Sequence, residues 1–141
     1  MTGLSGWEAG TVLAPREFLV TRADLVGYAE ASGDHNPIHV DEEVALAVGL
    51  PGVIAHGMYT LGLAARAVAG WTGGAQVLDL GAKFTAPVVV PAEGGVTVRV
   101  AGTVKAVDDG RATLALEVTC EGKKVLGAPR AVVAIGAVAG G

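Results

Sequence analysis

The residues most able to do chemistry lie close together between positions 32 and 39, where the sequence reads Ser-Gly-Asp-His-Asn-Pro-Ile-His. Asp34 and His39 combine a carboxylate with an imidazole, two kinds of side chain that hold and move protons near neutral pH. Pro37 prevents a regular helix here, because its ring clashes with the preceding turn. A tight turn can therefore bring Asp34 and His39 to one cleft, and this loop is a candidate acid–base site.

The same loop also has a structural interpretation. Asp34 and Asn36 are residue types that organise turns by bonding to nearby backbone, and His39 could pack behind such a turn. A metal interpretation is weaker. His35 and His39 have the spacing of a zinc-binding helix, but Pro37 breaks that helix and no third ligand has a fixed spacing. We therefore predict no metal and no cofactor.

A second candidate feature is the sequence Ala-His-Gly-Met at 55–58, directly at the start of a long apolar segment. The first N–H groups of a helix have no partner within it and lie at the positive end of its dipole. Gly57 has no side chain, so a carbonyl oxygen could approach its N–H closely, as in an oxyanion site for a thioester. The alternative is that Gly57 permits close helix–sheet packing and that His56 is a satisfied core residue.

Together, the two features predict one kind of reaction. A carbonyl bound at the Gly57 N–H would be stabilised as an enolate, which acidifies its α-carbon. Asp34 and His39 could then move a proton at the α-carbon and a water at the β-carbon. That chemistry is the dehydration of a 3-hydroxyacyl group, or the reverse hydration.

Three helices are predicted in the part of the chain that must position these residues. Thr21 begins a capping-box-like sequence, and helical spacing of apolar residues continues to Gly33, which ends the first helix. Asp41 can cap a second, short helix. Over Gly57–Trp71 nearly every position is apolar and Arg66 is the only charge, which is typical of a helix that is buried on all sides.

The second half of the sequence predicts antiparallel strands. Apolar residues recur at every second position in three segments, at 78–84, 96–105 and 113–120. Asp109-Gly110 and Glu121-Gly122 are hairpin turn sequences. A last strand over 125–135 contains Pro129, which indicates a sheet edge or a bulge, and one more strand should occupy about 12–20. The sequence therefore predicts an α+β fold, with a curved antiparallel sheet of about five strands wrapped around the long helix.

Composition and charge limit the classes of function. The chain has 141 residues, 51% of them hydrophobic and 17% charged, with a formal net charge of −4. So apolar a chain is not disordered, and it has more apolar surface than one small domain easily hides, so we expect a buried interface between chains. The acidic balance, with no basic cluster longer than Lys123-Lys124, argues against a nucleic-acid partner.

We also expect no membrane segment and no secretory signal. The longest apolar run, Ala131–Gly141, is shorter than the ~20 residues that cross a bilayer. Residues 1–8 lack the basic and apolar regions of a signal peptide. Cys120 is the single cysteine and cannot form an intrachain disulfide, so we expect a cytoplasmic protein.

The residues quoted above resemble a known family. Tyr28, the 32–39 segment and Ala45 resemble the hydratase-2 motif of MaoC-like (R)-specific enoyl-CoA hydratases and (3R)-hydroxyacyl dehydratases. The segments 54–58 and 83–88 are also similar to this family, so the similarity spans nearly the whole chain. The length of the chain and the segments 25–28 and 122–124 look especially like the catalytic subunit of the heterodimeric (3R)-hydroxyacyl-ACP dehydratase of mycolic-acid-type fatty-acid synthase II.

This resemblance implies a single hot-dog domain over 1–141, dimers with the acyl tunnel near the subunit interface, and an acyl-ACP or acyl-CoA substrate. It implies Asp34 and His39 as the catalytic pair, Gly57 as the donor to the thioester carbonyl and Asn36 as a supporting hydrogen-bond partner. We expect His39 to be the base at the α-carbon and Asp34 to hold the water, although the two roles could be exchanged. The dimer could pair with itself or with a hot-dog paralogue.

Two other functions are available on the same fold. A thioesterase needs a carboxylate on or near the central helix to activate water, and residues 57–71 contain none. A non-catalytic acyl-binding or partner subunit would have no use for an intact Asp34–His39 pair. The sequence therefore favours a hydro-lyase that reversibly dehydrates (3R)-hydroxyacyl thioesters.

Overall fold

The computed structural model describes residues 6–135, so the expectations for the first five residues and for the end of the apolar run after 135 lie outside the described residues. The elements follow in the order β1 (Val12–Val20), α1 (Arg22–Ser32), the 3₁₀ turn η1 (Pro37–His39), α2 (Glu42–Ala47), α3 (Gly57–Thr72), β2 (Val77–Phe84), β3 (Val96–Asp108), β4 (Arg111–Cys120), β5 (Lys123–Lys124) and β6 (Leu126–Ala134). Within this range, no helix combines the length and the apolar character that crossing a membrane requires.

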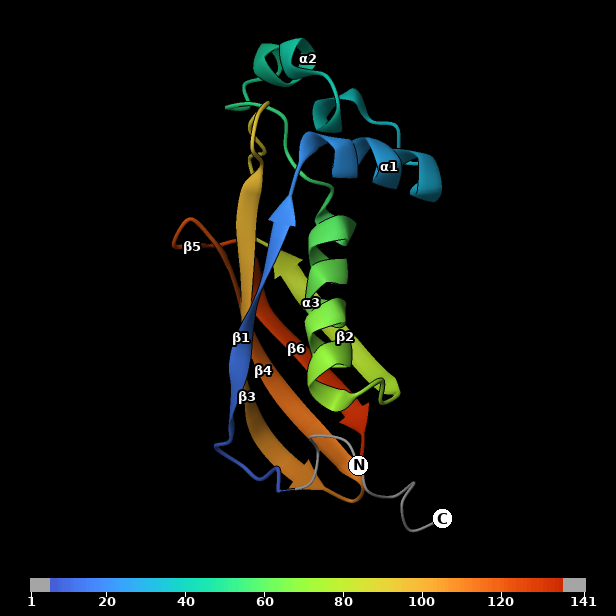
Figure 1. Ribbon diagram of the computed structural model, residues 1–141, viewed down its shortest axis with the longest axis vertical. Coiled ribbons are helices and arrows are strands. Elements are labelled where there is room, and N and C mark those ends of the chain that lie inside the picture. Colours follow the sequence, from blue (N-terminus) through green and yellow to red (C-terminus); the bar gives the residue numbers. More distant parts are fainter. Residues whose placement is uncertain (1–5, 136–141) are drawn as a thin grey trace.

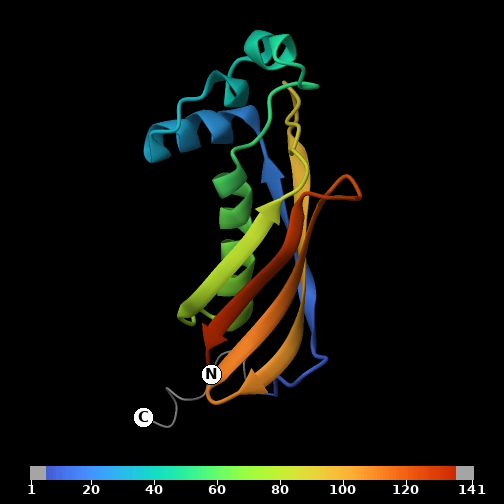
Figure 2. The ribbon, with the colours of Figure 1, turned by 180° about the vertical axis from the view of Figure 1, so that it is seen from behind.

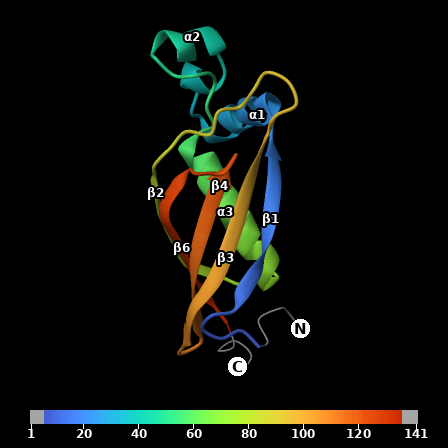
Figure 3. The same ribbon diagram turned by 90° about the vertical axis from the view of Figure 1, so that its left-hand side faces the viewer.

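One antiparallel sheet curves around α3. Its strand order is β1-β3-β4-β6-β2, and the two-residue β5 pairs with β4. Viewed from the side, strands β1, β3, β4 and β6 lie in front of α3, which runs along the concave face (Figure 3). At one end of the molecule, α1 and α2 gather over the start of α3 (Figure 1). The predicted α+β class and the helix-in-sheet arrangement are confirmed, with β5 added to the five longer strands.

Local sequence rules explain where the helices begin and end. Thr21 caps α1 through a reciprocal capping box, and Gly33 ends the helix in the left-handed conformation at φ 79°. Asp41 caps α2 by accepting hydrogen bonds from the first turn. Helix α3 begins after His56 with no side-chain cap at all. Its first N–H groups are therefore not satisfied by a capping side chain.

The predicted turns and the proline in β6 also follow local rules. Both residues of Asp109-Gly110 and of Glu121-Gly122 have positive φ angles, between 53° and 79°, as two-residue hairpin turns require. Pro129 marks a bulge rather than an edge, because β6 lies between β4 and β2. Ala128 beside it has a φ of 45°, and the pairing with β2 shifts register at this point.

Helix α3 is buried on one side only, which corrects the expectation of a helix buried on all sides. The side that packs against the sheet carries most of its large apolar residues, among them Leu63, Val68 and Trp71. The opposite side exposes Met58 and Arg66. The reason is geometric, because one curved sheet can cover only one side of a helix.

Strand β2 forms an edge of the sheet, as the view from behind shows (Figure 2). The alternation in the sequence placed Leu78 and Phe84 on the apolar face, yet they are 42% and 57% exposed. The strand pairs only with β6 and its register shifts twice, so a regular inner face does not form. An exposed apolar edge of this kind is typical of a surface that is covered in an assembly.

Candidate active site

The loop that joins α1 to α2 is folded by short bonds from side chains to backbone. Ser32 Oγ accepts a hydrogen bond from the Asp34 N–H, and Asp34 Oδ1 accepts one from the Asn36 N–H. Asn36 Oδ1 then accepts from the Ile38 N–H and starts the turn η1 that presents His39. The structural interpretation of Asp34 and Asn36 therefore holds, and it does not compete with a chemical role for Asp34.

His39 is buried, and its surroundings decide its tautomer. Its Nδ1 lies 2.8 Å from the carbonyl oxygen of Ile54. A carbonyl oxygen can only accept a hydrogen bond, so Nδ1 carries the hydrogen and Nε2 carries the lone pair. Nε2 is thus the nitrogen of His39 that can take a proton.

His56 lies directly against His39 and is 1% exposed. Its Nε2 is 3.1 Å from the backbone oxygen of Asp34, so this nitrogen donates and Nδ1 carries the lone pair. Nδ1 is buried and has no hydrogen-bond partner within residues 6–135. The His56 ring stacks on the ring of His39, with centroids 3.9 Å apart and planes at 23°, and Tyr28 meets it edge-on at 4.7 Å. Burial lowers the pKa of His56 from its ordinary value, so the ring favours the neutral form.

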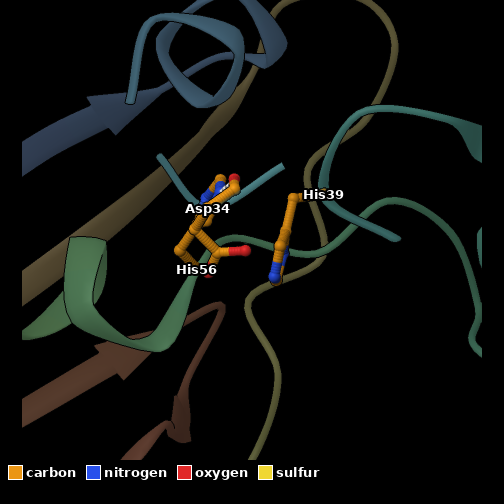
Figure 4. Close-up of side chains that lie close together, drawn as sticks. All are labelled: Asp34, His39 and His56. Atoms are coloured by element: carbon orange, nitrogen blue, oxygen red, sulfur yellow. Dashed lines mark hydrogen bonds between the residues drawn. The ribbon is translucent and has the colours of Figure 1, made fainter. Parts of the chain in front are cut away.

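One polar atom from each of Asp34, His39 and His56 lies within 4.8 Å of the other two (Figure 4). The acid and the imidazole of the candidate pair therefore meet. The cluster does not suit a shared metal ion. An imidazole binds a metal along the lone pair in its ring plane, and two stacked rings direct their lone pairs along separate planes.

A pocket of about 570 Å³ opens beside this cluster. Asp34, His39 and Gly57 all line it, together with Tyr28 and Thr60. The rest of its wall is mostly apolar and comes from the segment before α3 and the first turn of that helix, from the end of β2 and the segment after it, and from residues 125–126 at the start of β6. A pocket of this size, apolar with a few converging polar groups, is typical of a site for a small organic ligand.

Gly57 begins α3 at the pocket wall. Within the described part of the chain, no group accepts a hydrogen bond from its N–H, and no side chain caps the helix. The N–H is therefore a candidate donor to a ligand carbonyl. Glycine is also needed for packing, because a Cβ at this position would lie 3.0 Å from the ring of Phe84. The packing interpretation of Gly57 therefore has support in the structure, and the N–H stays a candidate donor.

Asn36, the remaining sequence-based candidate, lies outside the pocket wall. Asn36 is exposed and its side-chain oxygen is used in the turn, so the structure does not place it with Asp34 and His39 at the pocket. Phe84 forms part of the apolar wall, and the sequence had predicted no role for it in the site. A contact between β2 and the start of α3 leaves no local pattern, although the segment 83–88 resembles the family.

Comparison with protein families and curated proteins gives the following matches. Residues 8–126 match the family model described as "MaoC like domain". A segment of 80 residues is 39% identical to the 3-hydroxyacyl-thioester dehydratase X of Mycobacterium tuberculosis and covers 56% of this chain and 28% of that protein. A segment of 44 residues is 48% identical to the 3-hydroxybutyryl-CoA dehydratase of Methylorubrum extorquens and covers 31% of this chain and 28% of that protein. The matched segments thus span less than a third of these relatives.

Solved structures with the same fold cover much more of the chain. A MaoC-like dehydratase superimposes with a TM-score of 0.90 at 35% identity and covers 96% of this chain and 42% of that one. An (R)-hydratase from A. caviae, described as involved in PHA biosynthesis, superimposes with a TM-score of 0.83 at 26% identity and covers 93% of this chain and 98% of that one.

Proposed function

This chain belongs to the MaoC-like domain family of hot-dog folds, and from that premise we propose that it reversibly dehydrates (3R)-hydroxyacyl thioesters to trans-2-enoyl thioesters. The single observation that carries the proposal is that Asp34, His39 and Gly57 line one pocket. A general base, a group that can hold water and a free backbone N–H are the parts this reaction needs. The two relatives described above are named as dehydratases of hydroxyacyl thioesters, which supports the proposal.

In the proposed dehydration, the thioester oxygen accepts a hydrogen bond from the Gly57 N–H, which stabilises the enolate that forms. His39 Nε2 takes the proton from the α-carbon. The electron pair of that C–H bond then forms the α,β double bond as the bond from the β-carbon to the hydroxyl breaks. The departing hydroxide, held by Asp34, takes the proton back from His39 and leaves as water. His39 is neutral again, and hydration follows the same path in reverse.

The test is an assay of the hydration of trans-2-butenoyl-CoA, in which the loss of enoyl-thioester absorbance measures the rate. We expect Asp34→Asn and His39→Ala each to lower kcat by about 10²- to 10⁴-fold, the usual contribution of a placed proton-transfer group. His35→Ala is the matched control, because His35 is an exposed histidine of the same loop that does not line the pocket. Full activity in both site variants, with circular dichroism unchanged, would rule the proposal out.

The same assay separates the two other functions. A thioesterase would release free thiol, and among the residues lining the pocket Asp34 is the sole carboxylate that could activate a water for it. A non-catalytic acyl-binding subunit would bind the enoyl thioester without converting it. We propose that neither describes this chain.

For its partners, we propose an acyl group carried by CoA or by ACP and a second hot-dog chain, either a copy of this one or a paralogue. The exposed edge strand β2 and the uncovered side of α3 support this arrangement, because both leave large apolar side chains open in the isolated chain, among them Leu78, Phe84 and Met58. The native mass of the chain expressed alone separates a homodimer from a chain that needs a different partner.

A further inference from the structure

The buried histidine at the start of α3 has contacts that a core residue would not need. We propose that His56 is a positioning residue, a neutral imidazole that holds Asp34 and His39 at a fixed separation from each other. The inference rests on the proposed function, since it concerns the same pocket. It adds a third residue to the pair, acting through both members and not on the substrate.

The first contact fixes Asp34. The other hydrogen bonds of Asp34 within the described chain are local, to Ser32 and Asn36. The bond from His56 Nε2 to the Asp34 backbone oxygen is the one that joins this residue to a distant part of the fold. Asp34 is otherwise exposed. Without His56, its carboxylate would follow the motions of a loop.

The second contact fixes His39. The bond from Nδ1 to Ile54 holds one point of the His39 ring but still allows the ring to tilt about that point. The His56 ring, stacked at 3.9 Å, closes the space into which His39 would tilt. Tyr28 packs edge-on against His56, and Tyr59 packs edge-on against Tyr28 at 5.4 Å, so the supporting ring is itself held.

The orphaned nitrogen of His56 is consistent with this role. A protonated His56 would bury an N–H without an acceptor and would place a positive charge beside His39, opposing the proton that His39 must take. In the neutral ring, the nitrogen without a partner carries a lone pair and no hydrogen. Leaving that lone pair without a partner costs less than burying an N–H without an acceptor. The ring can therefore support a base without weakening it.

Two variants separate the contacts. His56→Phe keeps a flat ring for His39 and loses the donor to Asp34, whereas His56→Gln keeps an N–H donor and loses the ring. We expect each to lower kcat for trans-2-butenoyl-CoA hydration by about 10- to 100-fold, as small misplacements of reacting groups do, with KM changed much less. Thr72→Val is the matched control. Thr72 is a fully buried polar residue of the same helix that bonds to the Val68 carbonyl, so its loss should lower the melting temperature and leave kcat unchanged.

A double variant shows whether His56 acts through Asp34. In the Asp34→Asn background, His56→Phe should cost less than about 3-fold in kcat, because residues that act as a unit do not contribute additively. Losses that multiply in the double variant, or wild-type kcat in both single variants, would overturn the inference.

A readout without turnover keeps this test apart from the proposed function. The chain has three histidines, so ¹⁵N spectra of histidine-labelled protein resolve each ring. The inference predicts the Nε2–H tautomer for His56 and a shift of the His39 resonances in His56→Gln, which loses the stacked ring, that is absent in Thr72→Val. An unchanged His39 spectrum in His56→Gln overturns it. If wild-type protein hydrates no enoyl thioester, the proposed function fails while this measurement still decides the positioning.

Discussion

The two buried histidines of the pocket have opposite tautomers, and a backbone carbonyl sets each one. His39 donates from Nδ1 to Ile54, and His56 donates from Nε2 to Asp34. The free nitrogen of His39 can therefore act as a base, while that of His56 is buried away from solvent. Under the proposed function, the acid–base chemistry uses the lone pair on His39 Nε2 beside a neutral His56.

The pKa of His56 gives a prediction for stability. Burial lowers this pKa below 6.5 in the folded protein, so below pH 6.5 the unfolded chain binds a proton that the folded chain resists. The free energy of unfolding should therefore fall as the pH decreases through 6.5, and less steeply in His56→Phe, which has no such proton to bind. Urea unfolding at pH values on either side of 6.5 measures the two slopes. Equal slopes in wild type and His56→Phe would contradict the prediction.

A second prediction concerns Gly57. In Gly57→Ala the new Cβ would lie 3.0 Å from the Phe84 ring, beside the N–H proposed to bind the thioester, and we expect kcat/KM to fall by about 10- to 100-fold. Gly62→Ala is the control on the same helix, because a Cβ there meets nothing within 4 Å. It should keep full activity and gain about 0.5–1 kcal/mol from helix propensity. Equal activity in the two variants would remove Gly57 from the site.

At the scale of elements, the features that the sequence predicts well are those set by neighbouring residues. The caps at Thr21 and Asp41 and the hairpin at Asp109-Gly110 are local, and each lies where the sequence predicts it. The uncovered side of α3 and the contact of His56 with Asp34 could not be predicted from the sequence. They depend on which segments pack together in three dimensions, and no local pattern records that.

The connection between β2 and β3 offers a test of local strain. Gly94 and Gly95 both have positive φ, at 81° and 75°, but only at Gly95 would a Cβ clash with another backbone atom, the Val20 oxygen. Gly94→Ala should cost about 1 kcal/mol of unfolding free energy, the strain of the left-handed region alone. Gly95→Ala should cost at least about 2 kcal/mol more, because neither β1 nor β3 can move aside easily. Denaturant unfolding of the two variants measures the difference, and equal costs would show that this contact is not rigid.

At the scale of the whole molecule, one chain leaves apolar surface open on several elements, among them β2 and α3. Strand β2 exposes Leu78 and Phe84 at the sheet edge, and α3 exposes Met58. The high apolar fraction of the sequence predicts an interface between chains, and these surfaces are where the fold would place it. The sequence alone does not locate it, because alternation along β2 is the same for an edge strand as for an inner one.

A charge on this edge should separate the proposed dimer. Leu78→Lys places an ammonium on β2, and we expect the native mass by light scattering to fall to that of one chain at micromolar concentration, since a lysine there opposes edge pairing. Val12→Lys is the control, because Val12 is 77% exposed on β1 at the opposite edge. It should keep the mass of the wild type. A monomer from Val12→Lys and a dimer from Leu78→Lys would instead place the interface at β1.

The uncapped start of α3 has a consequence for finding the natural substrate. Within the described chain no group accepts a hydrogen bond from the Gly57 N–H, and under the proposed function the carbonyl oxygen of a bound thioester would accept it. Binding and thermal stability are coupled, because a ligand that binds only the folded protein raises its melting temperature. Acyl thioesters of increasing chain length can thus be ranked by the rise in melting temperature that each one produces, before any turnover is measured.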